Sequence, residues 1–243
     1  MKRTLVIGDI HGGFKALQQV LIKAKFDAEK DQLICLGDYV DGWSESAEVV
    51  DFLLGIQNKA KFCNNGNDPI FIRGNHDEWC NEWLQTGVAK RIWLTQGGAA
   101  TFESYQRTNL HLEDSHKKFF KNLHNYYIDN QNRGFVHAGY QSYDGLGNDT
   151  AANYMWDREI AYMLPMRSSD PIPRVLRPHE ELYIGHTTTL QWKTTDPINL
   201  HGKYWNLDTG GGWSGKLTIM DIDTKEYWQS DFVKDLYPEE KGR

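Results

Sequence analysis

The chain has 243 residues, of which 40% are hydrophobic and 13% aromatic, and its net charge is −6 at pH 7. A chain of this length can bury the core of one large α/β domain, and nothing in it resembles a linker or a low-complexity tract. The acidic balance argues against non-specific binding to nucleic acid or to an anionic membrane surface. We therefore expect a single domain over residues 1–243, with neither nucleic acid nor a membrane as its partner.

The cysteines and the first residues bear on the compartment. Cys35, Cys63 and Cys80 share no close spacing, and an odd number of cysteines does not suggest a disulfide framework. The apolar run at 4–7 is too short for a signal-peptide core, and a membrane span needs about 20 apolar residues. The sequence therefore predicts a cytoplasmic protein.

Predicted strands and helices alternate in the first part of the chain. The apolar run at 4–7 is followed over 14–24 by apolar residues at helical spacing. A second run at 33–36 precedes another such helix over 49–56, and a third apolar run lies at 70–72. The chain therefore begins with βα units.

The pattern changes after the third strand. Residues 78–127 are mostly helical in pattern and are interpreted as a helical cap inserted into the domain. Runs at 126–128 and 134–136 flank a polar turn, which predicts a hairpin. We place a second sheet in the β-rich remainder, with strands over 204–207, 216–222 and 226–230. The expected fold is a two-sheet β-sandwich of the α/β class, flanked by helices.

Five apolar runs each end in a cluster of Asp, Asn, His and Gly. The clusters are Gly8-Asp9-Ile10-His11-Gly12, Gly37-Asp38-Tyr39-Val40-Asp41, Arg73-Gly74-Asn75-His76-Asp77, His137-Ala138-Gly139 and Gly185-His186-Thr187. Taken singly, such residues beside glycine could be helix caps or turn formers. Taken together, five strand ends that carry carboxylates and imidazoles indicate one shared site, because unpaired charge at the rim of a core is costly.

The residue types in these clusters predict a metal site. Oxygens of Asp and Asn together with His nitrogens suit manganese, iron or zinc. Two such ions about 3.5–4 Å apart generate hydroxide at neutral pH and clamp the attacking and leaving oxygens of a displacement at phosphorus. The sequence therefore predicts a hydrolase with two divalent metal ions.

The same motifs resemble the PPP-type serine/threonine phosphatases within the calcineurin-like metallophosphoesterases, especially bacterial and phage-type members. The family pattern GDxHG stands at 8–12, GDxVD at 37–41, GNH with an acid at 74–77, HAG at 137–139 and GHT at 185–187. Their order and gaps agree over nearly the whole chain, and Asp208-Thr209-Gly210 resembles the closing DTG of the family. Five ordered motifs are far more specific than one.

The resemblance implies which residues bind each of the two metal ions. Asp9 and His11 would bind the first ion, Asp38 would bridge both, and the second would be bound by Asn75, His137 and His186. Manganese is the expected metal, with iron or zinc as alternatives. The other histidines, which have no partner in the pattern, are expected to be solvated or structural.

The resemblance also implies catalytic roles. His76 would be the general acid that protonates the leaving oxygen, and Asp41 would fix its tautomer. Arg158 would grip the phosphate, since a guanidinium pairs bidentately with phosphate oxygens, although a surface ion pair is the alternative. Trp79, Trp83 and Trp93 in the predicted cap could form an apolar wall for the substrate, but the helical spacing of Trp79 and Trp83 favours packing in a core.

One position departs from the family pattern. The family sequence GDxVDRG places a second phosphate-binding arginine directly after the aspartate, whereas this chain has Gly42 and then Trp43. Losing such a preorganised charge can cost about a hundredfold in rate. Arg73 is the nearest candidate by sequence, but a residue before Gly74-Asn75 can equally pair with an acid.

The sequence predicts a metal-dependent phosphatase that acts on phosphomonoesters, of the serine/threonine phosphoprotein type, by direct attack of a metal-bridging hydroxide. A symmetric bis(5'-nucleosyl)-tetraphosphatase-like nucleotide hydrolase is the alternative within hydrolases. A metal-binding module without catalysis is the alternative of another class. Intact His76 and Asp41 argue against the module. The expected partner is thus a phosphoprotein or a small phosphoester or nucleotide.

Overall fold

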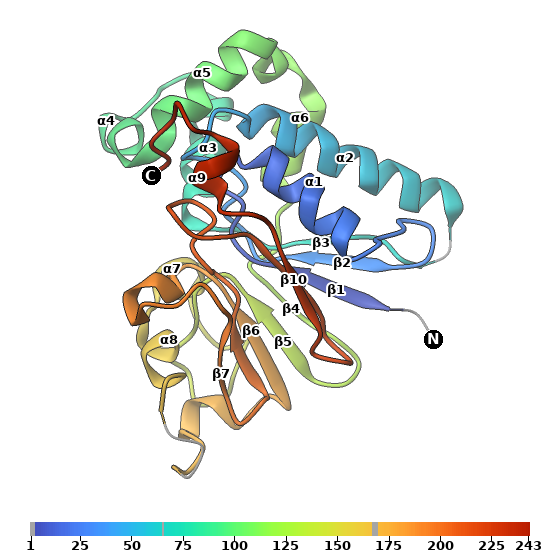
Figure 1. Cartoon of the computed structure of the whole chain (residues 1–243), viewed down its shortest axis with the longest axis vertical. Coiled ribbons are helices and arrows are strands. Elements are labelled where there is room, and N and C mark those ends of the chain that lie inside the picture. The colour runs from blue at the N-terminus through green and yellow to red at the C-terminus, as the bar shows by residue number, and fades with distance from the viewer. Residues whose placement is uncertain (1–2, 65, 167–169) are drawn as a thin grey trace.

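In the computed structural model, which describes residues 3–64, 66–166 and 170–243, two five-stranded sheets lie between layers of helices (Figure 1). The first sheet has the order β10-β9-β1-β2-β3. Its strands are β1 (Thr4–Ile7), β2 (Gln32–Cys35), β3 (Ile70–Phe71), β9 (Thr218–Asp221) and β10 (Tyr227–Gln229). The strands β1, β2 and β3 are parallel, and β9 runs antiparallel to both β1 and β10.

The second sheet has the order β4-β5-β6-β8-β7. Its strands are β4 (Tyr126–Ile128), β5 (Arg133–Val136), β6 (Glu181–Ile184), β7 (Ile198–Leu200) and β8 (Tyr204–Asn206). The predicted hairpin is present, because β4 and β5 pair antiparallel. The strands β5, β6 and β8 are parallel, so their carboxyl ends share one edge of the sheet.

Helices cover the outer faces of both sheets (Figure 1). The first sheet is covered by α1 (Phe14–Lys23) and α2 (Ser46–Cys63), and the second lies beside α7 (Ala151–Trp156) and α8 (Glu159–Met163). Near the C-terminal end of the chain lies α9 (Val233–Leu236). Short helical turns are η3 (Arg174–Leu176) and η4 (Thr189–Trp192).

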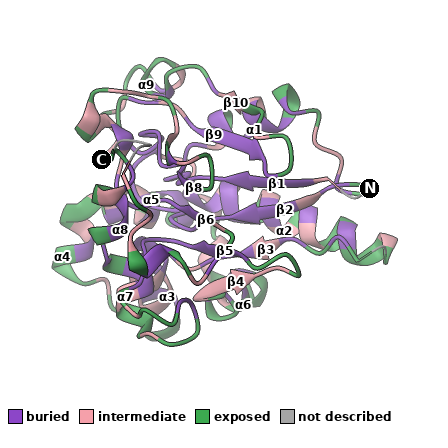
Figure 2. Ribbon diagram, turned by 90° about the horizontal axis from the view of Figure 1, so that it is seen from below, coloured by how far each residue is buried: buried purple, intermediate pink, exposed green. Residues whose placement is uncertain are grey.

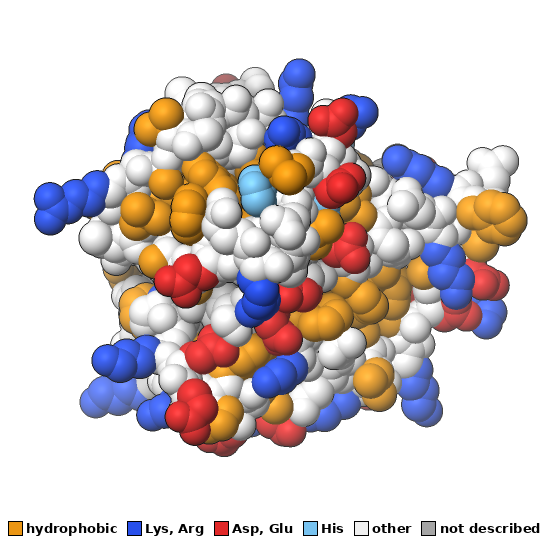
Figure 3. Space-filling model, turned by 90° about the horizontal axis from the view of Figure 1, so that it is seen from above, with side chains coloured by type: hydrophobic (Ala, Val, Ile, Leu, Met, Phe, Trp, Pro, Cys, Tyr) orange, Lys and Arg blue, Asp and Glu red, His pale blue; other side chains and the backbone are white. Residues whose placement is uncertain are grey.

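The stretch between β3 and β4 is helical. It contains α3 (Asn75–Thr86), α4 (Arg91–Trp93), η1 (Leu94–Gly98), α5 (Ala99–Thr108), η2 (Leu110–Leu112) and α6 (Asp114–Lys121). Both α5 and α6 pack on α2, and together these helices form one end of the molecule. Seen from above, this end shows hydrophobic side chains between scattered Lys, Arg, Asp and Glu (Figure 3). Among the described residues, none of the helices combines the length and hydropathy of a membrane-crossing segment.

Side chains alternate along the strands between two apolar layers. Leu5 and Ile7 of β1 pack with the helices, whereas Val6 packs between the sheets with Phe135 and Tyr183 of the second sheet. Completely burying such a side chain contributes about 1.5–3 kcal/mol. The inner strands β1, β5, β8 and β9 are accordingly buried along their length, whereas β4 and β10 at the sheet edges are partly exposed and the helices expose one side (Figure 2). This packing holds the two sheets face to face, with their parallel strands ending at one site.

The predicted α/β fold with two sheets and flanking helices is confirmed, but the membership of the second sheet was partly wrong. Only β8 of the three predicted C-terminal strands lies in it. Both β9 and β10 belong to the first sheet, where Ile7 of β1 lies opposite Ile219, and the blue and red strands run side by side in Figure 1. Alternation along β9 places Met220 between the sheets, but it does not specify which strand β9 pairs with.

Candidate active site

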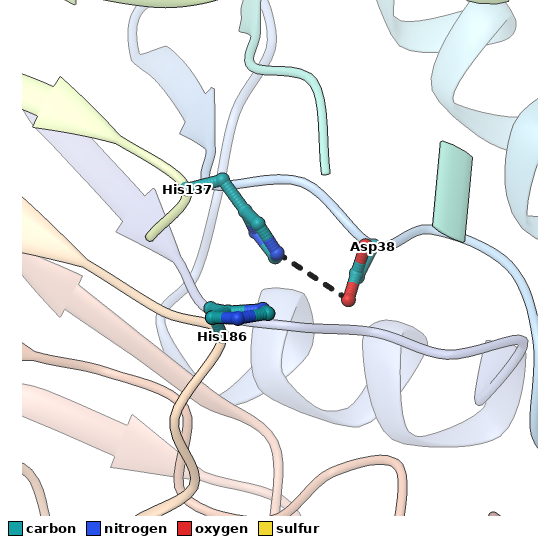
Figure 4. A group of neighbouring side chains, drawn as sticks. All are labelled: Asp38, His137 and His186. Atoms are coloured by element: carbon teal, nitrogen blue, oxygen red, sulfur yellow. Dashed lines mark ion pairs between the residues drawn. The ribbon is translucent and has the colours of Figure 1, made fainter. Parts of the chain in front are cut away.

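The candidate metal ligands follow the carboxyl ends of parallel strands. Asp9 and His11 follow β1, Asp38 follows β2, His137 follows β5 and His186 follows β6. Open α/β sheets bind ligands at this end of their strands. Because the two sheets face each other, residues far apart in the sequence point into one space, as Asp38, His137 and His186 do in Figure 4.

The backbone at the site is strained. Left-handed φ values of 50°, 49°, 70° and 65° occur at His11, Asp38, Asp41 and His186. Such values are uncommon outside glycine, cost about 1–3 kcal/mol each and cluster at functional sites. The turn at each of these strand ends thus aims a polar side chain inward at the expense of local stability.

One group of candidate ligands surrounds Asp38 from the second sheet. The ligand atoms of Asp38, His137 and His186 lie within 4.8 Å of one another. Asp38 Oδ2 is 3.4 Å from His137 Nε2, and Asn75 Oδ1 is 3.1 Å from the same nitrogen. The structure therefore brings together the four residues expected around the second ion.

A second group shares the same carboxylate. The ligand atoms of Asp9, His11 and Asp38 also lie within 4.8 Å of one another. His11 Nε2 is 3.5 Å from Asp38 Oδ2 and 3.9 Å from Asp9 Oδ2. Asp38 Oδ2 thus lies between two imidazole nitrogens, one from each group, which is where a ligand shared by two ions would lie.

Hydrogen bonds prepare the imidazoles for a cation. His11 Nδ1 lies 2.9 Å from the carbonyl of Val40, and His137 Nδ1 lies 2.9 Å from the carbonyl of Leu36. A carbonyl only accepts, so each Nδ1 carries the proton and each Nε2 keeps its lone pair. Buried Asp38 Oδ2 and His186 Nε2 have no hydrogen-bond partner among the described residues. Orphaned buried atoms are costly, and divalent cations would satisfy them.

The electrostatics fit the same ligands. Burial lowers the pKa of His11 to about 3, and the nearby Arg243 guanidinium acts in the same direction. Burial also lowers the pKa of His137 and His186, so all three imidazoles are neutral at pH 7. Burial and the neighbouring Asp208 raise the pKa of Asp9 well above its usual range. A bound cation would offset the repulsion between these buried carboxylates.

Asp77 holds the loop that carries Asp38. Its Oδ2 accepts the backbone N–H of Asp38 at 2.7 Å and that of Gly74 at 2.9 Å, and its Oδ1 accepts the N–H of Tyr39 at 2.9 Å. Asp38 Oδ1 in turn accepts the N–H of His76 at 3.0 Å. Asp77 was not among the predicted site residues, although its position as the acid directly after GNH in the motif could have indicated a role there.

His76 and Asp41 form a buried pair beside the ligands. His76 Nδ1 lies 2.7 Å from Asp41 Oδ2, and the rings of His76 and His11 are 5.3 Å apart. Asp41 also accepts the Nε1–H of Trp93 at 2.8 Å and the hydroxyl of Thr101 at 2.7 Å. Burial raises the pKa of Asp41, while these three donors oppose the rise.

Two of these contacts come from the helical stretch that follows β3. Trp93 ends α4 and Thr101 lies in the first turn of α5. Trp93 is buried, which agrees with the alternative that it packs in a core, and its indole N–H also donates to Asp41. Trp79 is only partly buried, with its ring 5.1 Å from that of His76 and 5.4 Å from that of Trp156. The stretch therefore contacts the site rather than only covering it.

The two arginines considered from the sequence lie in different places. Exposed Arg158 precedes α8, and its Nη1 donates to Thr187 Oγ1 at 3.1 Å, beside His186. Arg73 instead pairs with Glu78 at 2.8 Å and donates to backbone carbonyls at and just after the end of α6. Arg158 therefore lies at the rim of the site, whereas Arg73 holds two helical segments together.

Two groups of Asp and His ligand atoms that share Asp38, set at the strand ends of this two-sheet fold, fit a metal-dependent enzyme. The family model for calcineurin-like phosphoesterases matches residues 2–221, and the chain belongs to this family.

Named relatives include phosphatases with different substrates. The chain is 27% identical to serine/threonine-protein phosphatase 2 of Escherichia coli, over 89% of this chain and 91% of that one. It is 35% identical to a symmetrical bis(5'-nucleosyl)-tetraphosphatase of Proteus mirabilis, over 93% of this chain and 96% of that one. The cold-active protein-tyrosine phosphatase of a psychrophilic Shewanella shares the fold, with a TM-score of 0.61 and 13% identity over 95% of this chain and 81% of that one.

Proposed function

We propose that this chain is a phosphomonoesterase with a dinuclear metal centre, in which Asp9, His11 and Asp38 hold one ion and Asp38, Asn75, His137 and His186 hold the other. The observation that carries the proposal is the position of Asp38 Oδ2, which is 3.5 Å from His11 Nε2 and 3.4 Å from His137 Nε2. Manganese is our first expectation and iron or zinc are alternatives, because availability decides among metals that suit such ligands.

The chemistry divides between the ions and the side chains. When bound, the ions supply the attacking hydroxide and the positive charge that draws in a phosphate. His76 delivers a proton to the leaving oxygen, and Asp41, 2.7 Å from its Nδ1, stabilises the protonated imidazole. Arg158 binds phosphate oxygens from the rim, where its guanidinium already lies beside Thr187. No covalent intermediate on the protein is needed.

Substrate choice is open between two classes. We favour phosphoserine and phosphothreonine in proteins, supported by the likeness to the Escherichia coli phosphatase over most of both chains. The 35% identity to the Proteus mirabilis tetraphosphatase favours a nucleotide anhydride as the second candidate. Initial rates on a phosphopeptide panel and on diadenosine tetraphosphate, at equal metal content, would rank them. A higher kcat/KM on the dinucleotide would reverse our preference.

The state of the cysteine thiols supports a proposal for the cellular compartment. The three cysteines are free, and Cys35 and Cys80 are buried without a partner thiol. Such cysteines suit a reducing environment, so we propose a cytoplasmic location. Fractionation of cells that express the chain would test it, and recovery outside the cytoplasm would overturn it.

Metal removal is the first expected result. Purified protein with added Mn²⁺ should hydrolyse p-nitrophenyl phosphate and lose that activity in excess chelator, because the ions supply the attacking hydroxide and the charge opposite phosphate. Activity should return when Mn²⁺, Fe²⁺ or Zn²⁺ is restored. Absence of turnover with any of these metals, in protein that binds them, would instead support a module without catalysis.

Thr101→Val should lower kcat about tenfold, a part of the hundredfold or more that general acid catalysis supplies. Thr101 Oγ1 donates to Asp41 Oδ1 at 2.7 Å and accepts the N–H of Asp41 at 2.8 Å, so its loss loosens the partner of His76. We expect KM and metal content to stay unchanged. Thr108→Val, whose hydroxyl bonds the backbone of its own helix, is the matched control. A lower melting temperature at normal kcat would make Thr101 merely structural.

A further inference from the structure

The C-terminal segment, residues 237–243, covers Gly42 and Trp43, which follow Asp41 where the family pattern has its second phosphate-binding arginine. The ring of Tyr237 stacks on that of Trp43 with centroids 5.2 Å apart and an interplanar angle of 20°. Glu240 accepts the backbone N–H of Ser44 at 2.9 Å and its hydroxyl at 2.7 Å. These contacts fasten the segment onto the loop that starts at Gly42.

The segment brings a guanidinium to the candidate metal site. The backbone N–H of Arg243 donates to the carbonyl of Gly212 at 2.9 Å, which fixes where the side chain starts. Its Nη1 lies 3.3 Å from His11 Nε2, and its guanidinium carbon lies 5.3 Å from the centre of the Trp213 ring. In Figure 1 the C-terminal end accordingly lies on the same side of the molecule as α3.

Gly42 and Arg243 compete for one space. A Cβ built on Gly42 would lie 3.3 Å from Arg243 Cγ and 3.1 Å from the carbonyl oxygen of His11. The φ of Gly42 is +133°, which L side chains rarely adopt. An arginine at position 42 would therefore need a different backbone, and its side chain would meet the side chain of Arg243.

The Arg243 guanidinium is also available to an anion. Among the described residues, no carboxylate lies within ion-pair distance of it, in contrast to Arg73, which Glu78 neutralises. Arg243 is half-buried and lines a hollow of about 570 Å³ together with Thr188, Trp213 and Lys241. The carboxylates of Asp9, Asp38 and Asp208 interact with the guanidinium electrostatically from a greater distance, and Glu240 also lines the hollow. A cation beside the ligand groups that no carboxylate holds in an ion pair suits the phosphate of an incoming substrate.

We propose that Arg243 supplies the phosphate-binding cation that Gly42 lacks, so that the substrate phosphate is gripped by Arg158 and Arg243. This inference rests on the proposed function. The contact with His11 Nε2 is incompatible with that nitrogen binding a metal ion, because one lone pair cannot serve both. With a metal ion held by His11, Nη1 of Arg243 would be free to donate to a phosphate oxygen.

The test compares phosphate binding by variants of the complete chain loaded with Mn²⁺. The variants are Arg243→Gln, which keeps a long side chain and the backbone contact to Gly212, and Arg243→Lys. Lys241→Ala is the matched control, since Lys241 lines the same hollow but does not contact His11. Calorimetry gives the Kd of inorganic phosphate, and competition with p-nitrophenyl phosphate gives its inhibition constant.

We expect Arg243→Gln to weaken phosphate binding about tenfold to a hundredfold, because it removes a charge-assisted hydrogen bond to the phosphate. Arg243→Lys keeps the positive charge and should therefore lose less of the phosphate affinity. Lys241→Ala should stay within about twofold, as screened surface charges do. Melting temperatures and Mn²⁺ content should match the wild type.

Two results would overturn the inference. Unchanged phosphate binding by Arg243→Gln would show that the guanidinium does not touch the anion. Tighter Mn²⁺ binding by metal-free Arg243→Gln, at unchanged phosphate affinity, would make Arg243 a competitor of the metal instead. Failure of the proposed function is distinguishable, because wild-type protein would then neither bind phosphate nor hydrolyse p-nitrophenyl phosphate, and this inference would fall with it.

Discussion

Replacing Asp38 with alanine is expected to empty both metal positions and to lower kcat on p-nitrophenyl phosphate by at least about 10³-fold, more than one electrostatic contact usually supplies. The reason is that Asp38 Oδ2 lies between the two ligand groups, 3.5 Å from His11 Nε2 and 3.4 Å from His137 Nε2. Elemental analysis of the dialysed protein measures the metal content, and Mn²⁺ should no longer raise the melting temperature as it does for a binding protein.

Asp31→Ala is the matched control for this experiment. Asp31 is also a buried carboxylate, but its Oδ2 pairs with Arg3 Nη2 at 2.5 Å, away from the ligands. Its loss should lower stability while the protein keeps its manganese and its kcat. If Asp38→Ala retained the wild-type metal content, the shared carboxylate, and with it the dinuclear site, would have to be given up.

Replacing His76 with glutamine is expected to separate substrates by their leaving groups. With phenyl phosphate or a phosphoserine peptide, kcat should fall about 10²–10⁴-fold, the contribution of general acid catalysis, because the departing oxygen then lacks a proton donor. With p-nitrophenyl phosphate the loss should be smaller, since a stable phenolate departs without protonation. Metal content should be unchanged, because His76 belongs to neither ligand group. A series of substituted phenyl phosphates measures the dependence.

His116→Gln provides the comparison. His116 is a buried histidine whose Nδ1 lies 3.0 Å from the hydroxyl of Tyr105, and it is absent from the candidate site. It should change stability without changing the dependence of kcat on the leaving group. An equal loss on all substrates in His76→Gln, or a loss of manganese, would show that His76 positions ligands instead of donating a proton.

The candidate ligands could be predicted because each lies in a short local pattern. Asp9, Asp38 and His186 directly follow glycine at the end of an apolar run, and such a turn is encoded by its own residues. The hairpin of β4 and β5 and the first two βα units were predicted for the same reason, as their contacts are near in sequence. The pairing of β9 with β1 was not predicted, because more than two hundred positions of the chain separate Ile7 from its partner Ile219. Such a pairing, and its register, is set by the packing of the sheets and not by the local sequence.

Residues that support the site were harder to predict. Thr101 touches Asp41 across 60 positions, and Arg243 reaches His11 across 232. Neither stands in a motif, and nothing in the local sequence marks them. Asp77 is the exception, since it follows GNH directly, but its three backbone contacts to the loops before it required the folded chain.

The sequence by itself was enough to predict the candidate ligands and to place each of them near the end of a strand, because strand, turn and side chain are adjacent in the chain. Tertiary structure alone decided which strands lie side by side, that one oxygen of Asp38 lies close to both ligand groups, and that a distant arginine fills the space beside Gly42. Those outcomes depend on packing between segments far apart in sequence, where apolar periodicity is the same for many partners and only shape and burial select one.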